Sequence, residues 1–218
     1  MKTALIAGAT GLVGGHCLSE LLASPSYDSV IAVGRRPLGL PQRGLRQVTT
    51  DLLTLSAEHA AGADDVFCCL GTTIKKAGSR DAFRSVDFDL PLALARAARS
   101  AGATRYCLVS SLGASPRART FYLRVKGELE DALGGFGFPS LIVVRPSLLL
   151  GDRVETRPGE HLAEFALRLA SPLLRGRWRK YRGIEASAVA RAMVRLAEQG
   201  AKGRRVVESD EIAHLAAS

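Results

Sequence analysis

The most constraining feature of this sequence is an apolar run that leads directly into three evenly spaced glycines. Residues 3–14 read TALIAGATGLVG, with Gly8, Gly11 and Gly14 three residues apart, and a helical pattern follows. A strand, a glycine turn and a helix in this order form the context in which a glycine fingerprint binds a dinucleotide. Gly8 permits the tight turn, Gly11 lets the backbone approach a pyrophosphate, and Gly14 lets the helix pack closely on the strand. An ordinary tight turn is the alternative.

Beyond this turn, short apolar runs alternate with longer segments of helical periodicity. Apolar runs lie near residues 3–7, 29–34, 65–70, 105–110 and 140–145, and helical patterns near 11–23, 87–101, 119–133 and 187–199. Strands that alternate with helices are typical of a parallel sheet with right-handed crossovers and two covered faces. The sequence therefore predicts an α/β fold, a Rossmann-like doubly wound parallel sheet with helices on both faces.

The chain is more irregular after residue 150. A loop (GDRVETRPGE) precedes a helical pattern near 160–170, and RRVVES with its tail is compatible with one last strand and helix. Because ligands of such folds sit at the carboxyl ends of the strands, we expect residues 150–200 to form a small cap on the substrate side. No linker divides the sequence, so residues 1–218 are expected to form one dinucleotide-binding domain.

Charge and cysteine content limit the classes of partner. The four cysteines include no CxxC pair, so neither a disulfide framework nor a metal site is expected. Glycines interrupt the uncharged opening run and no signal-cleavage motif closes it, which favours a cytoplasmic protein without a membrane span. The net charge of +9 comes from arginines spread along the chain, and only residues 175–182 (RGRWRKYR) concentrate it. A solvated surface is the favoured interpretation of that segment, ahead of an anionic substrate or acidic protein and then nucleic acid.

The end of the second strand distinguishes between dinucleotides. An NAD site usually has an acidic residue here for the ribose 2′-hydroxyl, whereas this chain has Gly34, Arg35 and Arg36. Two guanidiniums can bind a 2′-phosphate bidentately, so NADP(H) is the expected cofactor, with a solvated loop as the alternative. Asp51 and Leu52 follow a further short strand, which is expected between the runs at 29–34 and 65–70. They could bracket the adenine, or simply cap a helix.

A further candidate cofactor contact follows the strand expected near 65–70. Leu70, Gly71 and Thr72 stand there, and a small residue lets the chain pass close to the ribose and pyrophosphate. An ordinary strand-ending turn is the alternative.

A possible catalytic group lies at and after the end of the strand expected near 105–110. Ser110 and Ser111 end that strand, and Tyr122 and Lys126 come next, four residues apart and therefore on one face of a predicted helix. Hydride transfer to a carbonyl leaves an alkoxide that needs a proton, which a tyrosine beside an ammonium can donate. A serine hydroxyl can polarise the substrate oxygen. A Tyr-x-x-x-Lys pair alone is often accidental, but its place after the serines and the glycine turn makes it a catalytic candidate.

Together these segments resemble a known superfamily. GATGLVG, the VSS strand end, YxxxK and RPSLLLGDR are similar to the short-chain dehydrogenase/reductase superfamily, in its extended and atypical branch. More narrowly, FCCLGTTIKKAG, SSLGA, FYLRVKGELE and RPSLLLGDRVETRPGE resemble the Tat-interactive protein group of atypical reductases, from residue 3 to about 195. The resemblance implies a Rossmann fold that binds NADP(H), with Tyr122 and Lys126 as the catalytic pair. It places the pyrophosphate over Gly8, Thr10, Gly11, Leu12 and Val13, the 2′-phosphate at Arg35 and Arg36, and the nicotinamide beside Pro146 and Ser147.

Three departures limit what the resemblance carries over. The interval to Tyr122 is slightly short from either serine, so Ser110 and Ser111 both stay candidates for the substrate side. Asp87 stands where extended members commonly have an asparagine, and a helix-capping carboxylate is its favoured interpretation. The chain also begins at the first strand, without the amino-terminal extension of the Tat-interactive protein, so partner interactions of that extension are not transferred.

We therefore expect an NADP(H)-dependent oxidoreductase with a small-molecule carbonyl or alcohol substrate and Tyr122 as acid/base. An epimerase-like enzyme that passes through a ketone and an NADPH-sensing regulatory protein are the alternatives. No metal is expected. The helices near 87–101 and 119–133 often form a dimer face in this superfamily, so a homodimer is a further expectation. The sequence does not define the substrate.

Overall fold

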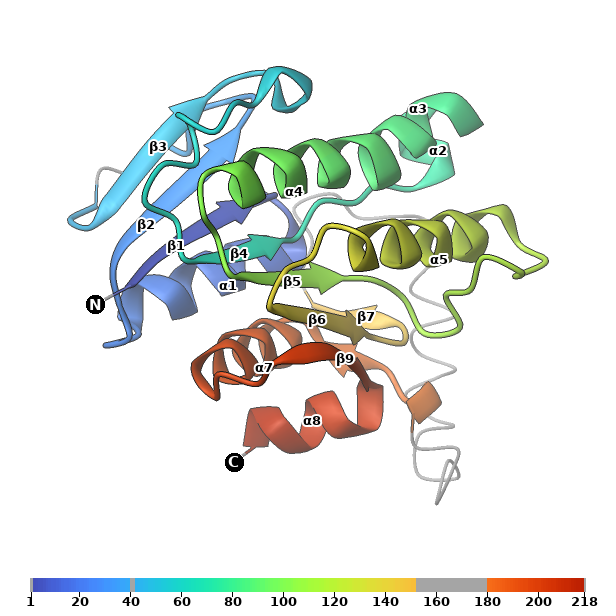
Figure 1. The fold of residues 1–218 in the computed structure, drawn as a ribbon. Coiled ribbons are helices and arrows are strands. Elements are labelled where there is room, and N and C mark those ends of the chain that lie inside the picture. The colour runs from blue at the N-terminus through green and yellow to red at the C-terminus, as the bar shows by residue number, and fades with distance from the viewer. Residues whose placement is uncertain (1, 40–41, 152–179, 218) are drawn as a thin grey trace.

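The computed structural model describes residues 2–39, 42–151 and 180–217 (Figure 1). Within them, seven parallel strands form one sheet in the order β3-β2-β1-β4-β5-β6-β9. The strands are β1 (Lys2–Ala7), β2 (Tyr27–Gly34), β3 (Leu45–Thr49), β4 (Asp65–Cys68), β5 (Arg105–Val109), β6 (Ser140–Arg145) and β9 (Gly203–Glu208). The strand order reverses between β1 and β4, and ligands of open α/β sheets bind beside such a reversal, outside the carboxyl ends of the strands.

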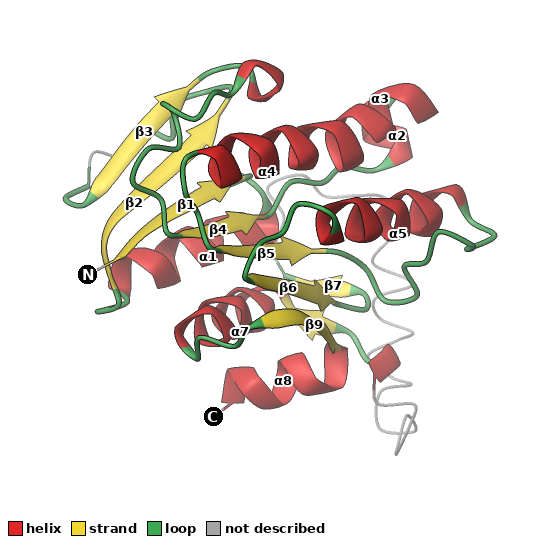
Figure 2. Ribbon diagram, in the orientation of Figure 1, coloured by secondary structure: helices red, strands yellow, loops and turns green. Residues whose placement is uncertain are grey.

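Helices cover both faces of this sheet (Figures 1 and 2). On one face lie α4 (Leu90–Ser100) and α5 (Phe121–Gly134), and on the other α1 (Leu12–Ala23) and α7 (Ala186–Glu198). The last helix, α8 (Ser209–Ala217), packs against α7 and β9. This arrangement confirms the predicted Rossmann-like doubly wound sheet, including the strand and helix expected at the end of the chain.

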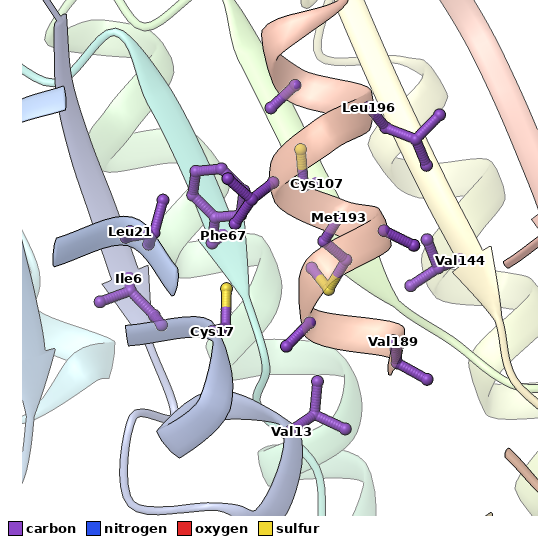
Figure 3. Packing of buried hydrophobic residues seen from close by; sticks show 14 of the residues in the cluster. Ile6, Val13, Cys17, Leu21, Phe67, Cys107, Val144, Val189, Met193 and Leu196 are labelled. Atoms are coloured by element: carbon purple, nitrogen blue, oxygen red, sulfur yellow. The ribbon is translucent and has the colours of Figure 1, made fainter. Parts of the chain in front are cut away.

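Each face of the sheet has its own apolar core. Ala4 and Ile6 of β1 join the core beneath α1 and α7, and the alternate residues Leu5 and Ala7 join the core beneath α4 and α5. The strands are therefore apolar on both faces, which is why they read as continuous apolar runs in the sequence. Figure 3 shows side chains of α1 and α7, among them Cys17, Leu21 and Met193, gathered against Phe67 and Cys107 of the sheet.

The adjacent cysteines at the end of β4 serve the two cores separately. Cys68 belongs to the core beneath α4 and α5, whereas Cys69 packs against the core beneath α1 and α7. Burial raises the pKa of Cys68 to about 11, so its thiol stays protonated near neutral pH. All four cysteines are free thiols.

The helix predicted from residue 87 begins earlier than expected. Ser79 accepts a hydrogen bond from the Ala82 N–H at 3.1 Å, and the chain then stays helical through α3 (Arg80–Arg84), a π-helical turn η2 (Ser85–Asp89) and α4. Asp87 therefore lies inside a helical segment. Its interpretation as the cap at the start of a helix is wrong, because Ser79 fills that role.

Several short elements were not predicted. They are η1 (Leu52–Thr54), α2 (Ile74–Ala77) and a two-stranded sheet of β7 (Leu149–Leu150) and β8 (Ile184–Glu185). Each is too short to show hydrophobic periodicity.

Most of the expected cap, including the helix near 160–170 and residues 175–179 of the basic segment, lies outside the described residues. Of the same basic segment, Lys180 is described, and it pairs with Glu208 at 2.8 Å.

Candidate functional site

The glycine turn joins β1 to α1 at the carboxyl edge of the sheet. Gly8 has a φ of +86°, and a Cβ on it would lie 2.6 Å from the Cys69 carbonyl. A Cβ on Gly14 would lie only 2.0 Å from the Gly8 carbonyl oxygen. Gly11 caps α1 without a side-chain hydrogen bond, so the first amides of the helix are open to an anion. Larger residues at Gly8 and Gly14 would collide with the backbone of the chain itself, so glycine is needed for α1 to begin this close to the turn. The open amides at the start of α1 fit a bound pyrophosphate.

The other residues expected at the pyrophosphate divide into two sets. Thr10 is exposed and Leu12 is half-buried, so both lie where a ligand over the turn could reach them. Val13 is buried, and only its backbone can face such a ligand.

The adenosine end of the expected site lies beyond β2 and β3. Arg35 and Arg36 directly follow β2, and both side chains are exposed. Asp51 accepts a hydrogen bond from the Leu53 N–H at 3.1 Å, so it acts as the cap that the sequence allowed. Leu52 is 2% exposed and belongs to the core, which leaves only its backbone for a contact with adenine.

A buried ion pair lies beneath the turn that follows β4. The Lys126 ammonium is 2.7 Å from the Asp87 carboxylate, and the other Asp87 oxygen accepts the Thr72 N–H at 2.8 Å. Gly71 lies over the pair, since a Cβ there would be 3.5 Å from Asp87 Oδ1 and 3.7 Å from Lys126 Nζ. Leu70, which precedes it, is half-buried. The turn is thus fixed to the ion pair and passes directly over it.

The charge on Lys126 is maintained by its neighbours. Burial alone lowers the pKa of Lys126, but the Asp87 carboxylate and, to a lesser extent, Tyr122 outweigh this effect. The pKa of Lys126 therefore lies above its ordinary value, and the amine is an ammonium throughout the neutral range.

Tyr122 lies one helical turn before Lys126, on the same face of α5. Its ring packs against Phe83 with centroids 5.7 Å apart, which fixes the ring while the residue stays half-exposed. The Ser115 N–H donates to the Leu123 carbonyl at 3.1 Å and so ties the loop after the serines to the start of α5. This loop and helix place Tyr122 on the carboxyl side of the sheet.

The two serines have different surroundings. Ser110 is buried and donates from its hydroxyl to Glu130 Oε1 at 2.5 Å, whereas Ser111 is half-exposed. Pro146 and Ser147 follow β6 beside them, and the Leu112 N–H donates to the Pro146 carbonyl at 2.9 Å. The Ser147 hydroxyl donates to the Arg182 carbonyl, so that side chain is already engaged.

Glu130 and Arg145 form a buried cluster that was not predicted from the sequence. Glu130 is fully buried and accepts both Arg145 Nε at 3.0 Å and Arg145 Nη2 at 2.5 Å. The available signal was the spacing of Glu130, four residues after Lys126 and eight after Tyr122 on one predicted helix face.

Comparisons with known proteins agree with this geometry. The family model described as NAD(P)H-binding matches residues 8–161. Protein HTATIP2 of Rattus norvegicus is 36% identical over 220 residues, which cover 98% of this chain and 89% of that protein. Protein fmp52, mitochondrial, of Emericella nidulans is 31% identical over 226 residues, covering 99% and 95%. Among solved structures, MoeE5 in complex with UDP-glucose and NAD matches with a TM-score of 0.72 at 23% identity, covering 99% of this chain and 81% of that chain. At that identity the likeness shows the fold alone.

The expectation of a cytoplasmic protein is contradicted. Several fungal relatives, from Emericella nidulans, Aspergillus clavatus, Debaryomyces hansenii and Coccidioides immitis, carry the name mitochondrial. The expectation rested on composition and on the glycine-interrupted opening run, and neither distinguishes the cytoplasm from an organelle. None of the helices among the described residues is long and apolar enough to cross a membrane. The same residues contain no cluster of three or more His, Cys, Asp or Glu side chains that could hold a metal ion.

Proposed function

Because the chain belongs to the NAD(P)H-binding family and to its HTATIP2-like group of atypical short-chain dehydrogenases/reductases, we propose that it is an NADP(H)-dependent oxidoreductase. Its substrate would be a small carbonyl compound or the corresponding alcohol. The observation that carries this proposal is the buried Lys126 ammonium, which Asp87 holds one helical turn from Tyr122 at the edge where the glycine turn opens.

Residues of this chain fit the proposed cofactor at both ends. The close approach of α1 to the turn, which Gly8 and Gly14 permit, and the open amides at the start of α1 suit a pyrophosphate. Exposed Arg35 and Arg36 suit a 2′-phosphate, which supports NADP(H) over NAD(H). When bound, the reduced cofactor would supply the hydride.

The proposed catalytic roles fall on three side chains. Tyr122 would donate its hydroxyl proton to the alkoxide oxygen that forms when a carbonyl is reduced. An ammonium has three N–H donors. Asp87 pairs with Lys126 on one side, so donors remain for a ribose hydroxyl and the Tyr122 oxygen. Ser111 would polarise the substrate oxygen, because the Ser110 hydroxyl is directed at Glu130.

The test combines binding with turnover. Calorimetric titration with NADPH and NADH measures binding, and NADPH oxidation is followed with benzaldehyde, cyclohexanone, menadione and related aldehydes, ketones and quinones. Reduction of at least one compound, lost on Tyr122→Phe, is the expected result. Tight NADPH binding without any turnover would instead favour the sensing alternative, and isomerisation of a sugar nucleotide without net oxidation would favour the epimerase-like one. A homodimer through α4 and α5 stays a prediction.

A further inference from the structure

Besides Asp87, two carboxylates of the described residues are fully buried, and they lie towards opposite edges of the sheet. Asp65 is the first residue of β4 and pairs with Lys2, Tyr27 and Arg105, which begin their own strands, so this cluster lies at the amino edge. Glu130, also 0% exposed, lies on α5 and contacts Ser110 and Arg145 at the carboxyl ends of β5 and β6. It also contacts Arg204, near the start of β9. Of these two clusters, only that of Glu130 reaches the edge that carries the proposed site.

Glu130 joins three separate strands. Its Oε1 accepts the Ser110 hydroxyl at 2.5 Å and Arg145 Nε at 3.0 Å. Its Oε2 accepts Arg145 Nη2 at 2.5 Å and Arg204 Nη2 at 3.2 Å. The carboxylate is therefore satisfied by charge-assisted hydrogen bonds, which are the strongest and most directional kind in proteins.

The contacts of Glu130 lie one residue from the proposed reacting groups. Ser110 directly precedes Ser111, and Arg145 directly precedes Pro146. The Leu112 N–H donates to the Pro146 carbonyl at 2.9 Å, so the two strand ends are also joined to each other. A shift of either strand end would move Ser111 and the expected nicotinamide contact together.

Glu130 also shares a helix face with the proposed catalytic residues. Tyr122, Lys126 and Glu130 follow each other at intervals of four residues on α5, so their side chains leave the helix on one side. Asp87 holds Lys126. Ser110 and Arg145 hold Glu130. One helix face thus carries the proposed proton donor and the anchor for the strands opposite it.

We propose that Glu130 is a positioning residue that fixes Ser111 and Pro146 relative to Tyr122. The inference rests on the proposed oxidoreductase function, since these distances matter only if Ser111 and Tyr122 act on one substrate oxygen. In this proposed role Glu130 touches neither substrate nor cofactor. Misplacing reacting groups by about 1 Å can slow an enzyme roughly a hundredfold.

The test compares Glu130→Gln with Asp65→Asn as a matched control. Each change removes one charge from a fully buried carboxylate that is paired with an arginine, and both should lower stability. Only Glu130→Gln should lower kcat/KM for the fastest compound of the carbonyl panel, by roughly 10- to 100-fold. The NADPH dissociation constant should stay unchanged in Asp65→Asn and change little in Glu130→Gln, because neither carboxylate lies at the glycine turn.

A second variant and a second readout keep the test independent of folding and of the substrate. Ser110→Ala removes one bond while both arginines stay paired with Glu130, and it should lower kcat/KM in the same direction but by less. Its effect should not add to that of Glu130→Gln, because both changes disturb the same hydrogen-bonded cluster. Amide hydrogen exchange at Leu112 should become faster in Glu130→Gln and stay unchanged in Asp65→Asn.

The outcomes separate the two proposals. Wild-type kcat/KM in a folded Glu130→Gln, or in Ser110→Ala if the former does not fold, overturns the positioning role. Equal losses of kcat/KM in Glu130→Gln and Asp65→Asn also overturn it, since they would reflect stability alone. If the wild-type protein reduces no carbonyl, the proposed function fails, and exchange at Leu112 then decides whether Glu130 fixes the strand ends.

Discussion

The Lys126 ammonium lies 2.7 Å from the Asp87 carboxylate, and neither side chain is more than 4% exposed. The same carboxylate accepts the Thr72 N–H, so it holds both the proposed catalytic lysine and the turn after β4. Each charge has lost nearly all its hydration and depends on the other for compensation. Removing one member should therefore cost far more than its contacts alone suggest.

Lys126→Met should lower the free energy of unfolding by about 3–5 kcal/mol, because it leaves the Asp87 charge buried without a partner. The double variant Asp87→Asn, Lys126→Met should lose less than the sum of the two single variants, since it leaves no charge behind. Urea denaturation with unchanged m-values measures all three. Strictly additive losses would show that the two charges are not coupled.

The pair also predicts a pH dependence of stability. In the wild-type protein the Lys126 pKa is raised, so its stabilising contribution is complete below the ordinary value of 10.5 and is lost only as pH rises through the native pKa. In Asp87→Asn, burial is left as the main influence and lowers that pKa. The unfolded chain then binds more protons than the native one, and stability should rise with pH towards 10.5.

The difference in unfolding free energy between wild type and Asp87→Asn should therefore be largest near neutral pH and narrow at alkaline pH. Denaturation at a series of pH values measures it. A difference that widens as pH rises would contradict the assigned ion pair.

Local sequence patterns predicted the fold and the glycine turn between β1 and α1. Gly8, Gly11 and Gly14 are diagnostic because the turn and the helix they begin are contiguous in the chain. Because β1 and β6 are buried on both faces, their residues form continuous apolar runs, and such runs identify strands in the sequence.

The ion pair and the Glu130 cluster could not be predicted in the same way. Asp87 meets Lys126, and Glu130 meets Arg145 and Arg204, only after separate strands and helices have packed together. A carboxylate inside a helix reads as a solvated face unless its tertiary partner is known. The interpretation of Asp87 as a helix cap is wrong for a related reason: its partner Lys126 lies on another helix, and Ser79 caps the segment instead.

Tyr122→Phe should lower turnover by roughly 10²- to 10⁴-fold, because it removes the transferable proton and keeps the ring that packs on Phe83. NADPH affinity should change little. Ser111→Ala should lower turnover while stability is kept, since the side chain is half-exposed. Steady-state kinetics with the carbonyl panel measures these effects, and a Tyr122→Phe protein with wild-type turnover would refute the proposed acid/base.

The double variant Arg35→Ala, Arg36→Ala should remove a preference for NADPH over NADH. A bidentate arginine contact with a phosphate contributes roughly 1.5–3 kcal/mol, and a tenfold preference needs about 1.4 kcal/mol. Both side chains are exposed, so their loss should not affect folding. Calorimetric titration measures both affinities. Equal affinities in the wild-type protein would contradict the assignment.

Gly14→Ala and Gly15→Ala should have opposite effects, although the two glycines are neighbours on α1. A Cβ on Gly14 would lie 2.0 Å from the Gly8 carbonyl oxygen, whereas a Cβ on Gly15 would meet nothing nearer than the Ala9 oxygen at 3.6 Å. Gly14→Ala must push α1 away from the turn, which should cost about 1–3 kcal/mol of stability, as overpacking does.

Gly15→Ala should instead stabilise the protein by up to about 1 kcal/mol, because alanine is the better helix former and ordinary contact distance is kept. The displaced helix start in Gly14→Ala should also weaken NADPH binding, since the amides that face the phosphate move with α1. Urea denaturation and NADPH titration of the two variants provide the measurement. If Gly14→Ala were as stable as Gly15→Ala and bound NADPH equally well, the close approach of α1 to the turn would not determine the cofactor site.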